Sequence, residues 1–311
     1  MQILHFGIMG LGHFGKHYVR LLKEMPGVEL AATANTSDES DAIINNKKID
    51  CVIIASPPAT HHNLIMRAID AGKNVLVEKP MVLTSHEALE IKNKLIDKDL
   101  VFMVGFQYLY NDYFRYLKEN IRKFGNIRYV FGEHLYGGPL RVDIGSFMDA
   151  AVHDCAILEY LFSPGDIISV TGASRSLTDS DRDDFSVATV TFQNGLLAHF
   201  LTSWYWPEKV RKVTLVGDKG MALFNDRDET KLRWFNTAYP ALDANKASLF
   251  LQDTIDQSAV VLDIQAREPL ANELTHFIEC INNHATPLTN IEFGCTITNR
   301  MEQIKNGLSK L

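Results

Sequence analysis

Residues 6–15 read FGIMGLGHFG, and they carry three glycines in the spacing GxGxxG directly after a run of apolar residues. The apolar run predicts a buried strand, and the pattern that follows predicts a helix. In this setting Gly10 allows a tight turn, Gly12 lets the pyrophosphate of a dinucleotide approach the backbone, and Gly15 lets the helix pack against the strand. This stretch therefore predicts a dinucleotide-binding Rossmann domain.

The residues that follow this motif alternate short apolar runs with helical patterns, which is typical of a parallel sheet with crossover helices. One helix is predicted between Thr60 and Gly72, and a capping box, TSHE at residues 84–87, predicts the start of another. The predicted strands are Leu4–Met9, Val28–Thr33, Cys51–Ala55, Asn74–Val77 and Val101–Val104. We therefore predict a doubly wound α/β domain over residues 1–110.

After residue 110 the pattern changes, and predicted strands follow one another along the chain. The residues QNG at 193–195 are a two-residue hairpin signal, so we expect a mainly antiparallel, open sheet. The predicted strands are Ile127–His134, Ile167–Ala173, Phe185–Phe192, Leu196–Ser203, Val210–Val216 and Met221–Phe224, and the predicted helices are Ser146–Phe162, Pro269–Asn282 and Glu292–Leu308. We predict an α+β domain over residues 111–311.

Composition and charge exclude several classes of function. The 311 residues are 46% hydrophobic with a formal net charge of -7, and no basic block could follow a nucleic acid or a membrane surface. The N-terminal residues lack a signal-peptide pattern, and no run of about 18 apolar residues occurs, so we expect a cytoplasmic protein. The four cysteines are widely spaced, which favours reduced core thiols and no metal site.

The residue at the end of the second strand bears on the choice of cofactor. An acid is expected there, about 20 residues beyond the last glycine, to bind the adenosine ribose. Residue 35 is Asn, which can hydrogen-bond a hydroxyl but has no charge to repel the 2′-phosphate of NADP. Thr36 suits either cofactor, and no arginine stands close by. The sequence leaves NAD and NADP open and favours NAD.

A second motif stands at the end of the fourth predicted strand. Residues 74–84 read NVLVEKPMVLT, so an apolar strand ends on a glutamate, a lysine and a proline. One interpretation is that the proline ends the strand while Lys79 reaches solvent. However, ligands of open parallel sheets bind outside the carboxyl ends of the strands, where Ser56 and Pro57 are also expected. There Lys79 would lie over the nicotinamide and stabilise an alkoxide or donate a proton.

A third candidate group lies in the predicted helix over residues 146–162. Asp149 and His153 are four residues apart, so they would lie within reach of each other on one face of that helix. A carboxylate that fixes the orientation of a histidine is a common general-base arrangement. The alternative is a solvent-exposed pair without a catalytic role.

Together these residues resemble the Gfo/Idh/MocA family, that of glucose-fructose oxidoreductase and inositol dehydrogenase, near its sugar and nucleotide-sugar dehydrogenases. The resemblance covers nearly the whole chain. It rests on the glycine motif, the Asp149 and His153 pair, and the stretches EKP at 78–80, VGFQ at 104–107, DDFSVATVTFQNG at 183–195, VTLVGDKGMALF at 213–224 and EPLANELTHFIECINNHATPLTN at 268–290.

The resemblance implies roles for these residues. Lys79 corresponds to the catalytic lysine, His153 to the acid/base histidine and Asp149 to the carboxylate before it, with a cis bond before Pro80 and a homodimer or homotetramer joined through the open sheet face. The predicted cofactor-binding residues are Gly10, Leu11, Gly12, His13, Phe14, Gly15, Asn35, Thr36, Ala55, Ser56, Pro57, His61, Glu78, Lys79 and Gln107.

The chain departs from the family pattern in two places. Ala151 and Ala156 stand where members commonly have a glycine and a carboxylate, so one substrate contact is in question. Only residues 35–49 separate the second strand from the next, where members usually fit a helix, a strand and another helix. We therefore expect one edge of the Rossmann sheet to be shortened.

We predict an NAD(P)-dependent oxidoreductase that transfers a hydride between nicotinamide and a secondary alcohol or ketone of a sugar, nucleotide sugar or polyol. The alternative is a catalytically inactive dinucleotide-binding sensor or partner-binding protein of the same fold. The aromatic stretch WYWPEKVR from Trp204 could stack on a sugar ring, but packing on the sheet is favoured.

Overall fold

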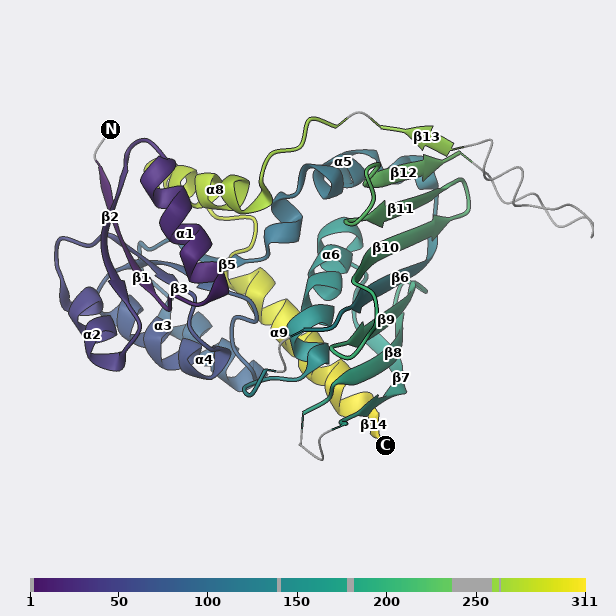
Figure 1. Ribbon diagram of the computed structural model, residues 1–311, viewed down its shortest axis with the longest axis horizontal. Coiled ribbons are helices and arrows are strands. Elements are labelled where there is room, and N and C mark those ends of the chain that lie inside the picture. Colours follow the sequence, from purple (N-terminus) through teal and green to yellow (C-terminus); the bar gives the residue numbers. More distant parts are fainter. Residues whose placement is uncertain (1–2, 139–140, 178–181, 237–258, 263) are drawn as a thin grey trace, which may run out of the picture. The chain divides into compact units, whose positions relative to one another are not determined.

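The computed structural model describes residues 3–138, 141–177, 182–236, 259–262 and 264–311. Its contacts divide the chain into two compact units (Figure 1). The first unit consists of Met1–Tyr110 and Arg267–Glu302, and the second consists of Asn111–Ala266 and Gln303–Leu311. The sequence prediction placed residues 267–302 in the second domain, whereas by their contacts they pack in the first unit. Element order along the chain does not reveal which sheet a late helix covers.

The first unit contains a five-stranded parallel sheet with the order β2-β1-β3-β4-β5. Its strands are β1 (Leu4–Met9), β2 (Val28–Ala34), β3 (Cys51–Ile54), β4 (Asn74–Glu78) and β5 (Phe102–Gly105). The strand order reverses between β1 and β3, which is the switch point where such sheets bind ligands. The predicted Rossmann sheet is confirmed. β2 is an edge strand, and α2 (Ser37–Asn45) leads from it to β3, as the predicted shortened edge requires.

Helices cover both faces of this sheet. α1 (His13–Glu24) and α8 (Pro269–Asn283) lie on one face, and α2, α3 (His61–Asp70) and α4 (Ser85–Lys94) lie on the other (Figure 1). Short helical turns η1 (Pro58–Thr60) and η2 (Gln107–Tyr110) follow β3 and β5. The last helix, α9 (Ile291–Gly307), belongs to this unit as far as Glu302. Predicted capping at Thr84 and Glu87 is confirmed at the start of α4.

The second unit is built on a nine-stranded sheet with the order β13-β12-β11-β10-β6-β9-β8-β7-β14. Its pairs are antiparallel except β6 with β9 and β14 with β7. The strands are β6 (Ile127–Leu135), β7 (Ile167–Arg175), β8 (Phe185–Phe192), β9 (Leu197–Ser203), β10 (Val210–Gly217), β11 (Met221–Asn225), β12 (Leu232–Phe235), β13 (Ala259–Val261) and β14 (Ser309–Lys310). The predicted mainly antiparallel sheet is confirmed.

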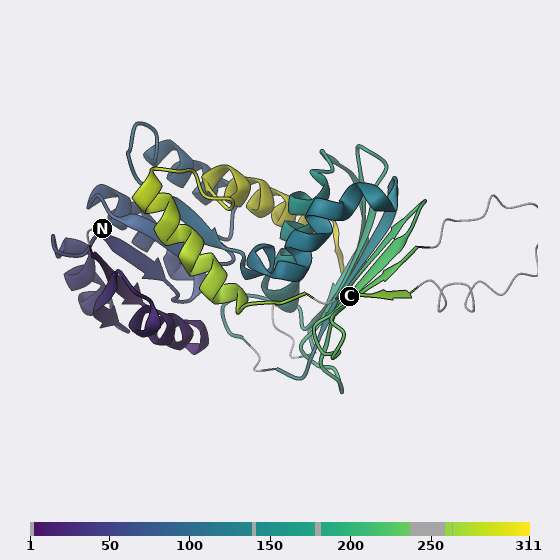
Figure 2. The same cartoon turned by 90° about the horizontal axis from the view of Figure 1, so that it is seen from above.

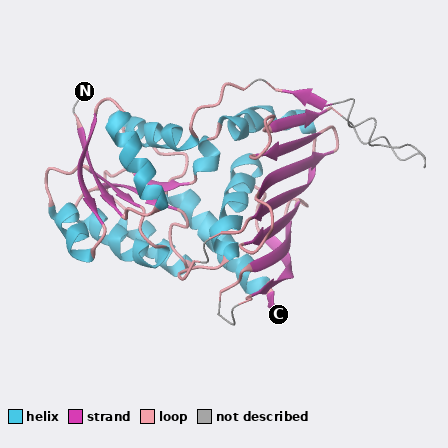
Figure 3. Cartoon of the chain, in the orientation of Figure 1, coloured by secondary structure: helices cyan, strands magenta, loops and turns pink. Residues whose placement is uncertain are grey.

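One face of this sheet is covered by helices and the other is open (Figures 2 and 3). α5 (Asp112–Asn120), the turn η3 (Ile121–Phe124) and α6 (Val152–Phe162) lie on the covered face, where the Phe114 ring of α5 is 4.7 Å from the Phe224 ring of β11. Within the described residues, no helix lies on the opposite face. This agrees with the predicted open sheet.

The QNG turn in this unit was predicted wrongly, and the helix over residues 146–162 is confirmed except for the type of its first turn. The QNG turn is a three-residue connection, because Phe192 N donates to Leu196 O and Gly195 N donates to Phe192 O, with Gly195 at φ 82°. A left-handed glycine after a tight turn is typical of a three-residue hairpin. The helix predicted over residues 146–162 begins as a π-helical segment, η4 (Phe147–Ala151), before α6. Spacing rules for an α-helix therefore do not hold at its start.

Two expectations drawn from composition can be compared with the structure. Among the described helices, none is long and apolar enough to span a bilayer. All four cysteines are free thiols, and Cys51, Cys155 and Cys280 are buried, as predicted for core thiols.

Candidate functional site

The glycine motif forms the loop between β1 and α1. Gly10 has φ 101°, and a Cβ there would lie 2.5 Å from the backbone of Ala55 and Ser56 at the end of β3. A Cβ on Gly15 would lie 1.9 Å from Gly10 O, whereas one on Gly12 would meet no atom within 4 Å. The loop therefore needs two glycines for its own packing, and at Gly12 it leaves open backbone that a pyrophosphate could approach.

The residues around Gly12 fit a phosphate group. Gly12 is the N-cap of α1, and no side chain caps this helix end. The first amides of a helix have no intrahelical partner, so they can donate to an anion. His13 is exposed, and Leu11 and Phe14 are half-buried beside it. The cradle thus suits the pyrophosphate of a dinucleotide.

Asn35 lies against this glycine loop. Its Oδ1 accepts a hydrogen bond of 2.8 Å from Leu11 N, which leaves its amide group able to donate to a ribose hydroxyl. The backbone N–H groups of Asn35 and Thr36 donate to Glu39 Oε2 at 2.7 and 3.0 Å. These bonds, led by that from Asn35, hold the pKa of Glu39 below its usual range. A carboxylate therefore stands at the end of β2 although residue 35 is not an acid.

His61 connects the ends of two neighbouring strands. It is fully buried, and its ring nitrogens lie 2.9 Å from Ser56 O and 3.0 Å from Pro80 O. Ser56 Oγ pairs in turn with Thr60 Oγ1 at 2.7 Å. Because both nitrogens face backbone carbonyls, we interpret His61 as a structural residue that connects the loops after β3 and β4. Its predicted contact with the cofactor stays a prediction.

Lys79 directly follows β4, at the same carboxyl edge as the glycine loop. It is 9% exposed, and its backbone N donates to Glu78 Oε2 at 3.1 Å. The peptide bond between Lys79 and Pro80 is cis, as the resemblance implied. At the end of β5, Gln107 is half-buried on η2. All the predicted cofactor-binding residues thus belong to the first unit and gather at strand ends, and their contacts with a cofactor stay predictions.

Asp149, in the second unit, lies in the π-helical segment and is held by a partly buried network. Its carboxylate accepts from Tyr136 Oη at 2.9 Å and from Arg141 Nη1 at 3.1 Å. Trp204 Nε1 donates to Tyr136 Oη at 2.9 Å. Burial and the nearby Asp149 charge raise the pKa of Tyr136, so this hydroxyl stays a donor. Asp149 is therefore a carboxylate of fixed orientation, and its predicted bond to His153 stays a prediction.

His153 occupies the first turn of α6 and is 8% exposed. This burial excludes the alternative of a solvent-exposed Asp and His pair. Its ring centroid lies 6.0 Å from that of His134, which pairs with Asp154 Oδ2 at 3.0 Å. A Cβ on Gly132 would lie 2.5 Å from the Asp154 carboxyl carbon, so glycine lets this pair form against the sheet. His153 is thus flanked by a buried His and Asp pair.

Sequence reasoning missed the partners of the second-unit residues. Arg141, Tyr136 and the His134 and Asp154 pair come from the end of β6, the loop after it and the start of α6, so no regular spacing joins them. The only signal in the sequence was the dipeptide HD at residues 153–154, which places two ionisable side chains on a helix predicted to be buried. Within the described residues, no group of three His, Cys, Asp or Glu side chains could hold a metal ion.

The comparisons with known proteins agree with this geometry. A family model described as "Oxidoreductase family, NAD-binding Rossmann fold" matches residues 28–106, and the "GFO/IDH/MocA C-terminal domain" matches residues 114–223. The two ranges together span more than half of the chain. This chain belongs to the Gfo/Idh/MocA family of oxidoreductases, and it is an NAD(P)-dependent enzyme of that family.

Individual relatives are similar to this chain over most of its length. The scyllo-inositol 2-dehydrogenase (NAD(+)) of Bacillus subtilis is 23% identical, covering 97% of this chain and 94% of its own length. The UDP-N-acetylglucosamine 3-dehydrogenase of Acidithiobacillus ferrooxidans is 25% identical, covering 89% of this chain and 88% of its own length. The structure of this second enzyme has a TM-score of 0.83 at 21% identity, covering 99% of this chain and 98% of that one.

A third relative is known from its crystal structure with a nucleotide cofactor. It is a 3-ketoreductase from Actinomadura kijaniata in complex with TDP-benzene and NADP, with a TM-score of 0.82 at 16% identity, covering 99% of this chain and 98% of that one. Structural similarity at this identity shows that the fold is shared. Both nicotinamide cofactors occur among the relatives.

Proposed function

We propose that this protein oxidises a secondary alcohol of a sugar, nucleotide sugar or polyol, or reduces the corresponding ketone. The observation that carries the proposal is the position of Lys79. This lysine is buried directly after β4, at the edge of the sheet where the Gly10 to Gly15 loop and Asn35 also stand. In a parallel sheet with this strand order, the carboxyl edge is where ligands bind.

Each of the three candidate catalytic residues has a distinct task in this proposal. When bound, the nicotinamide supplies the acceptor or donor of a hydride. The Lys79 ammonium stabilises negative charge on the substrate oxygen, and His153 takes the hydroxyl proton during oxidation or returns it during reduction. Asp149, fixed by Tyr136 and Arg141, orients the histidine.

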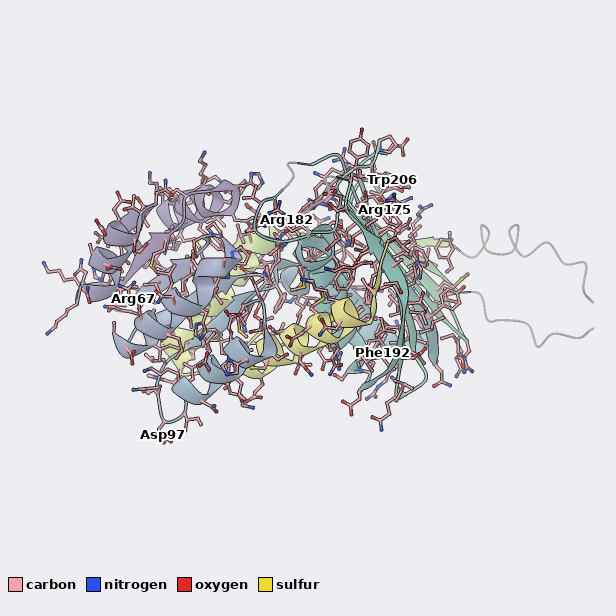
Figure 4. All side chains as sticks on the ribbon, turned by 90° about the horizontal axis from the view of Figure 1, so that it is seen from below. Arg67, Asp97, Arg175, Arg182, Phe192 and Trp206 are labelled. Atoms are coloured by element: carbon pink, nitrogen blue, oxygen red, sulfur yellow. The ribbon has the colours of Figure 1, made fainter. Side chains whose placement is uncertain are left out.

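The substrate class rests on the names of the relatives and on exposed aromatic residues. Two relatives act on an inositol and on a UDP-sugar by name. Trp204 is buried in the network, as favoured from the sequence, but Tyr205 is 75% and Trp206 39% exposed, and Trp206 is labelled in Figure 4. Aromatic faces such as these suit the apolar face of a sugar ring. No observation favours the alternative of a sensor without catalysis.

NAD is the favoured cofactor because of charge at the end of β2. The Glu39 carboxylate takes the backbone N–H groups of Asn35 and Thr36, which a 2′-phosphate would otherwise use. Its charge repels a phosphate and leaves a ribose hydroxyl unaffected. Glu39 thereby supplies the negative charge that position 35 lacks.

The open face of the second sheet suits assembly into a homodimer or homotetramer. Tyr129 and Leu197 are register partners on β6 and β9, and each is about 40% exposed, while Ile168 of β7 is 65% exposed. Exposed apolar patches on a sheet face are typical of protein interfaces. Light scattering after size-exclusion chromatography would measure the mass, and a monomer would contradict the assembly.

The proposed function is tested by following nicotinamide absorbance in a panel of inositols, UDP-sugars, simple sugars and linear polyols with NAD, and of the corresponding ketones with NADH. At least one compound should change the redox state of the cofactor at a rate proportional to enzyme concentration. If ligands bind across the panel without any redox change, the protein is a binding protein and the proposal fails.

A further inference from the structure

Three ionisable side chains meet inside the first unit at a point that the proposed reaction does not use. Tyr18 of α1 lies with its Oη 2.9 Å from Glu78 Oε1 of β4 and 2.9 Å from Glu273 Oε1 of α8. Tyr18 and Glu273 are fully buried, and Glu78 is 7% exposed. The cluster also stands directly before Lys79, whose backbone N donates to Glu78 Oε2.

The number of protons in this cluster follows from its geometry. A phenolic hydroxyl has one hydrogen to donate, and an ionised carboxylate can only accept. Tyr18 therefore satisfies one carboxylate and must accept from the other, which requires that the second carboxyl group carries a proton. The contacts leave room for one charge on the two carboxyl groups, as expected for acids that share a buried position.

The proton belongs on Glu273. This side chain is the more deeply buried of the two, and within the described residues its Oε2 has no hydrogen-bond partner. A charge on Glu273 would therefore be largely unsolvated. Glu78 has two donors, Tyr18 Oη and Lys79 N, and suits the ionised form.

The surroundings of Glu273 also favour its protonated form. Burial first, and then the Glu78 charge, raise the pKa of Glu273 well above its usual range, and the hydrogen bond from Tyr18 opposes them only in part. Burial and the two glutamates likewise raise the pKa of Tyr18. Tyr110 of η2 also faces the cluster, and burial raises its pKa, so both tyrosines stay neutral.

We propose that Glu273 is a neutral carboxylic acid that donates to Tyr18, which donates to Glu78, and that this directed chain positions Glu78 beside Lys79. A proton on Glu273 Oε1 gives every hydrogen in the chain an acceptor. Glu273 stands 195 residues after Glu78 in the sequence and is a positioning residue in a different element. The effect of Glu273 on cofactor binding rests on the proposed cofactor site at the end of β4, whereas the protonation of Glu273 does not.

The protonation is tested by urea unfolding of the wild type and Glu273→Gln between pH 5 and 9. The folded wild type keeps the proton that the unfolded chain releases, so its unfolding constant should rise relative to that of the variant by up to about tenfold per pH unit, from about pH 4.3 to the folded pKa. Glu279→Gln, an exposed position on the same helix with the same chemical change, should show no such divergence. Parallel pH profiles for wild type and Glu273→Gln would overturn the proposal.

Infrared spectroscopy of the wild type gives a measurement that does not depend on the folding of a variant. At pH 7, where exposed carboxyl groups are ionised, the folded protein should keep the carbonyl stretch of a protonated carboxyl group. Its absence would overturn the proposal.

The positioning role is tested by fluorescence titration with NADH at pH 7. Glu273→Met keeps the volume but cannot donate, and it should weaken NADH binding by about tenfold, whereas the Gln variant, which can donate, should stay within about threefold of wild type. Equal losses in both variants would refute positioning through donation. A wild type that does not bind NADH would refute the proposed function and leave the result on protonation unchanged.

Discussion

Each unit holds a tyrosine against a carboxylate, but the two networks offset the negative charge in different ways. In the first unit, Tyr18 joins Glu78 and Glu273, and the proton proposed on Glu273 removes one of the two charges. In the second, Tyr136 donates to Asp149, and the guanidinium of Arg141 offsets the charge. A proton can be lost as the pH rises, whereas a guanidinium keeps its charge at every pH at which proteins fold.

This difference gives the two units opposite pH dependence. Glu273 has a raised pKa in the folded state, so its contribution to stability is fully present below about pH 4.3 and falls as the pH rises toward the folded value. Asp143 also pairs with Arg141; although burial opposes it, hydrogen bonds and charge from Arg141 lower the pKa of Asp143. Its contribution is present above about pH 3.9 and is lost as the pH falls through the folded pKa.

The largest effect on the reaction rate should come from removing the ammonium group of Lys79, which directly follows Glu78 of the first network. Lys79→Met keeps the apolar stem and removes the ammonium, so single-turnover reduction of bound NAD should slow on the order of 100-fold or more. Binding of NADH should persist, since the glycine loop is unchanged. His153→Asn, beside the second network, should slow the same step comparably. Turnover within a few fold of wild type in the Lys79 variant would mean that this lysine does not act on the substrate oxygen.

Removing the guanidinium should break the second network. Arg141→Met leaves Asp149 and Asp143 without their cation and should lower the free energy of unfolding at pH 7 by about 2 kcal/mol, between the values for exposed and fully buried pairs. The loss should shrink toward pH 3, opposite to the trend expected for Glu273. Arg128→Met, whose ion pair with Asp218 is largely exposed, is the control and should change stability by about 0.5 kcal/mol or less. A loss that does not depend on pH would show that Arg141 acts through packing alone.

The smallest effect concerns the exposed charge at the end of β2. Glu39→Gln can still accept the bonds of the capping box but loses the charge, so NADP affinity should improve relative to NAD affinity by roughly threefold. Glu87→Gln makes the same change in the capping box of α4, away from β2, and should leave the ratio unchanged. Titration of both nucleotides against the three proteins measures this. Unchanged selectivity in Glu39→Gln would place the 2′ position of the ribose elsewhere.

Local patterns predicted most of the first unit. The strand β1, the loop through Gly10 and the capping box at Thr84 depend on residues adjacent in sequence, and the structure has them where the sequence placed them. The shortened edge followed from comparing the length of residues 35–49 with the family pattern, because these residues have room for little more than α2.

The networks could not be predicted in this way. Tyr18 and Glu273 are 255 residues apart and meet only because α1 and α8 share a face of the sheet. Asp149 was placed on an α-helix, but a π-helical turn there alters which side chains are neighbours. The strand β12 was not predicted, although β3 and β5, which are equally short, were.

Isotope transfer would show whether this protein passes a hydride between nicotinamide and a substrate carbon. NADH carrying deuterium at C4 would be incubated with the ketone that the panel identifies, and the alcohol product would be analysed by mass spectrometry. Direct hydride transfer would leave one deuterium on the carbon of the new alcohol when the label is on the transferred face of the cofactor, and none when the label is on the other face. Product without deuterium from either cofactor would contradict direct hydride transfer.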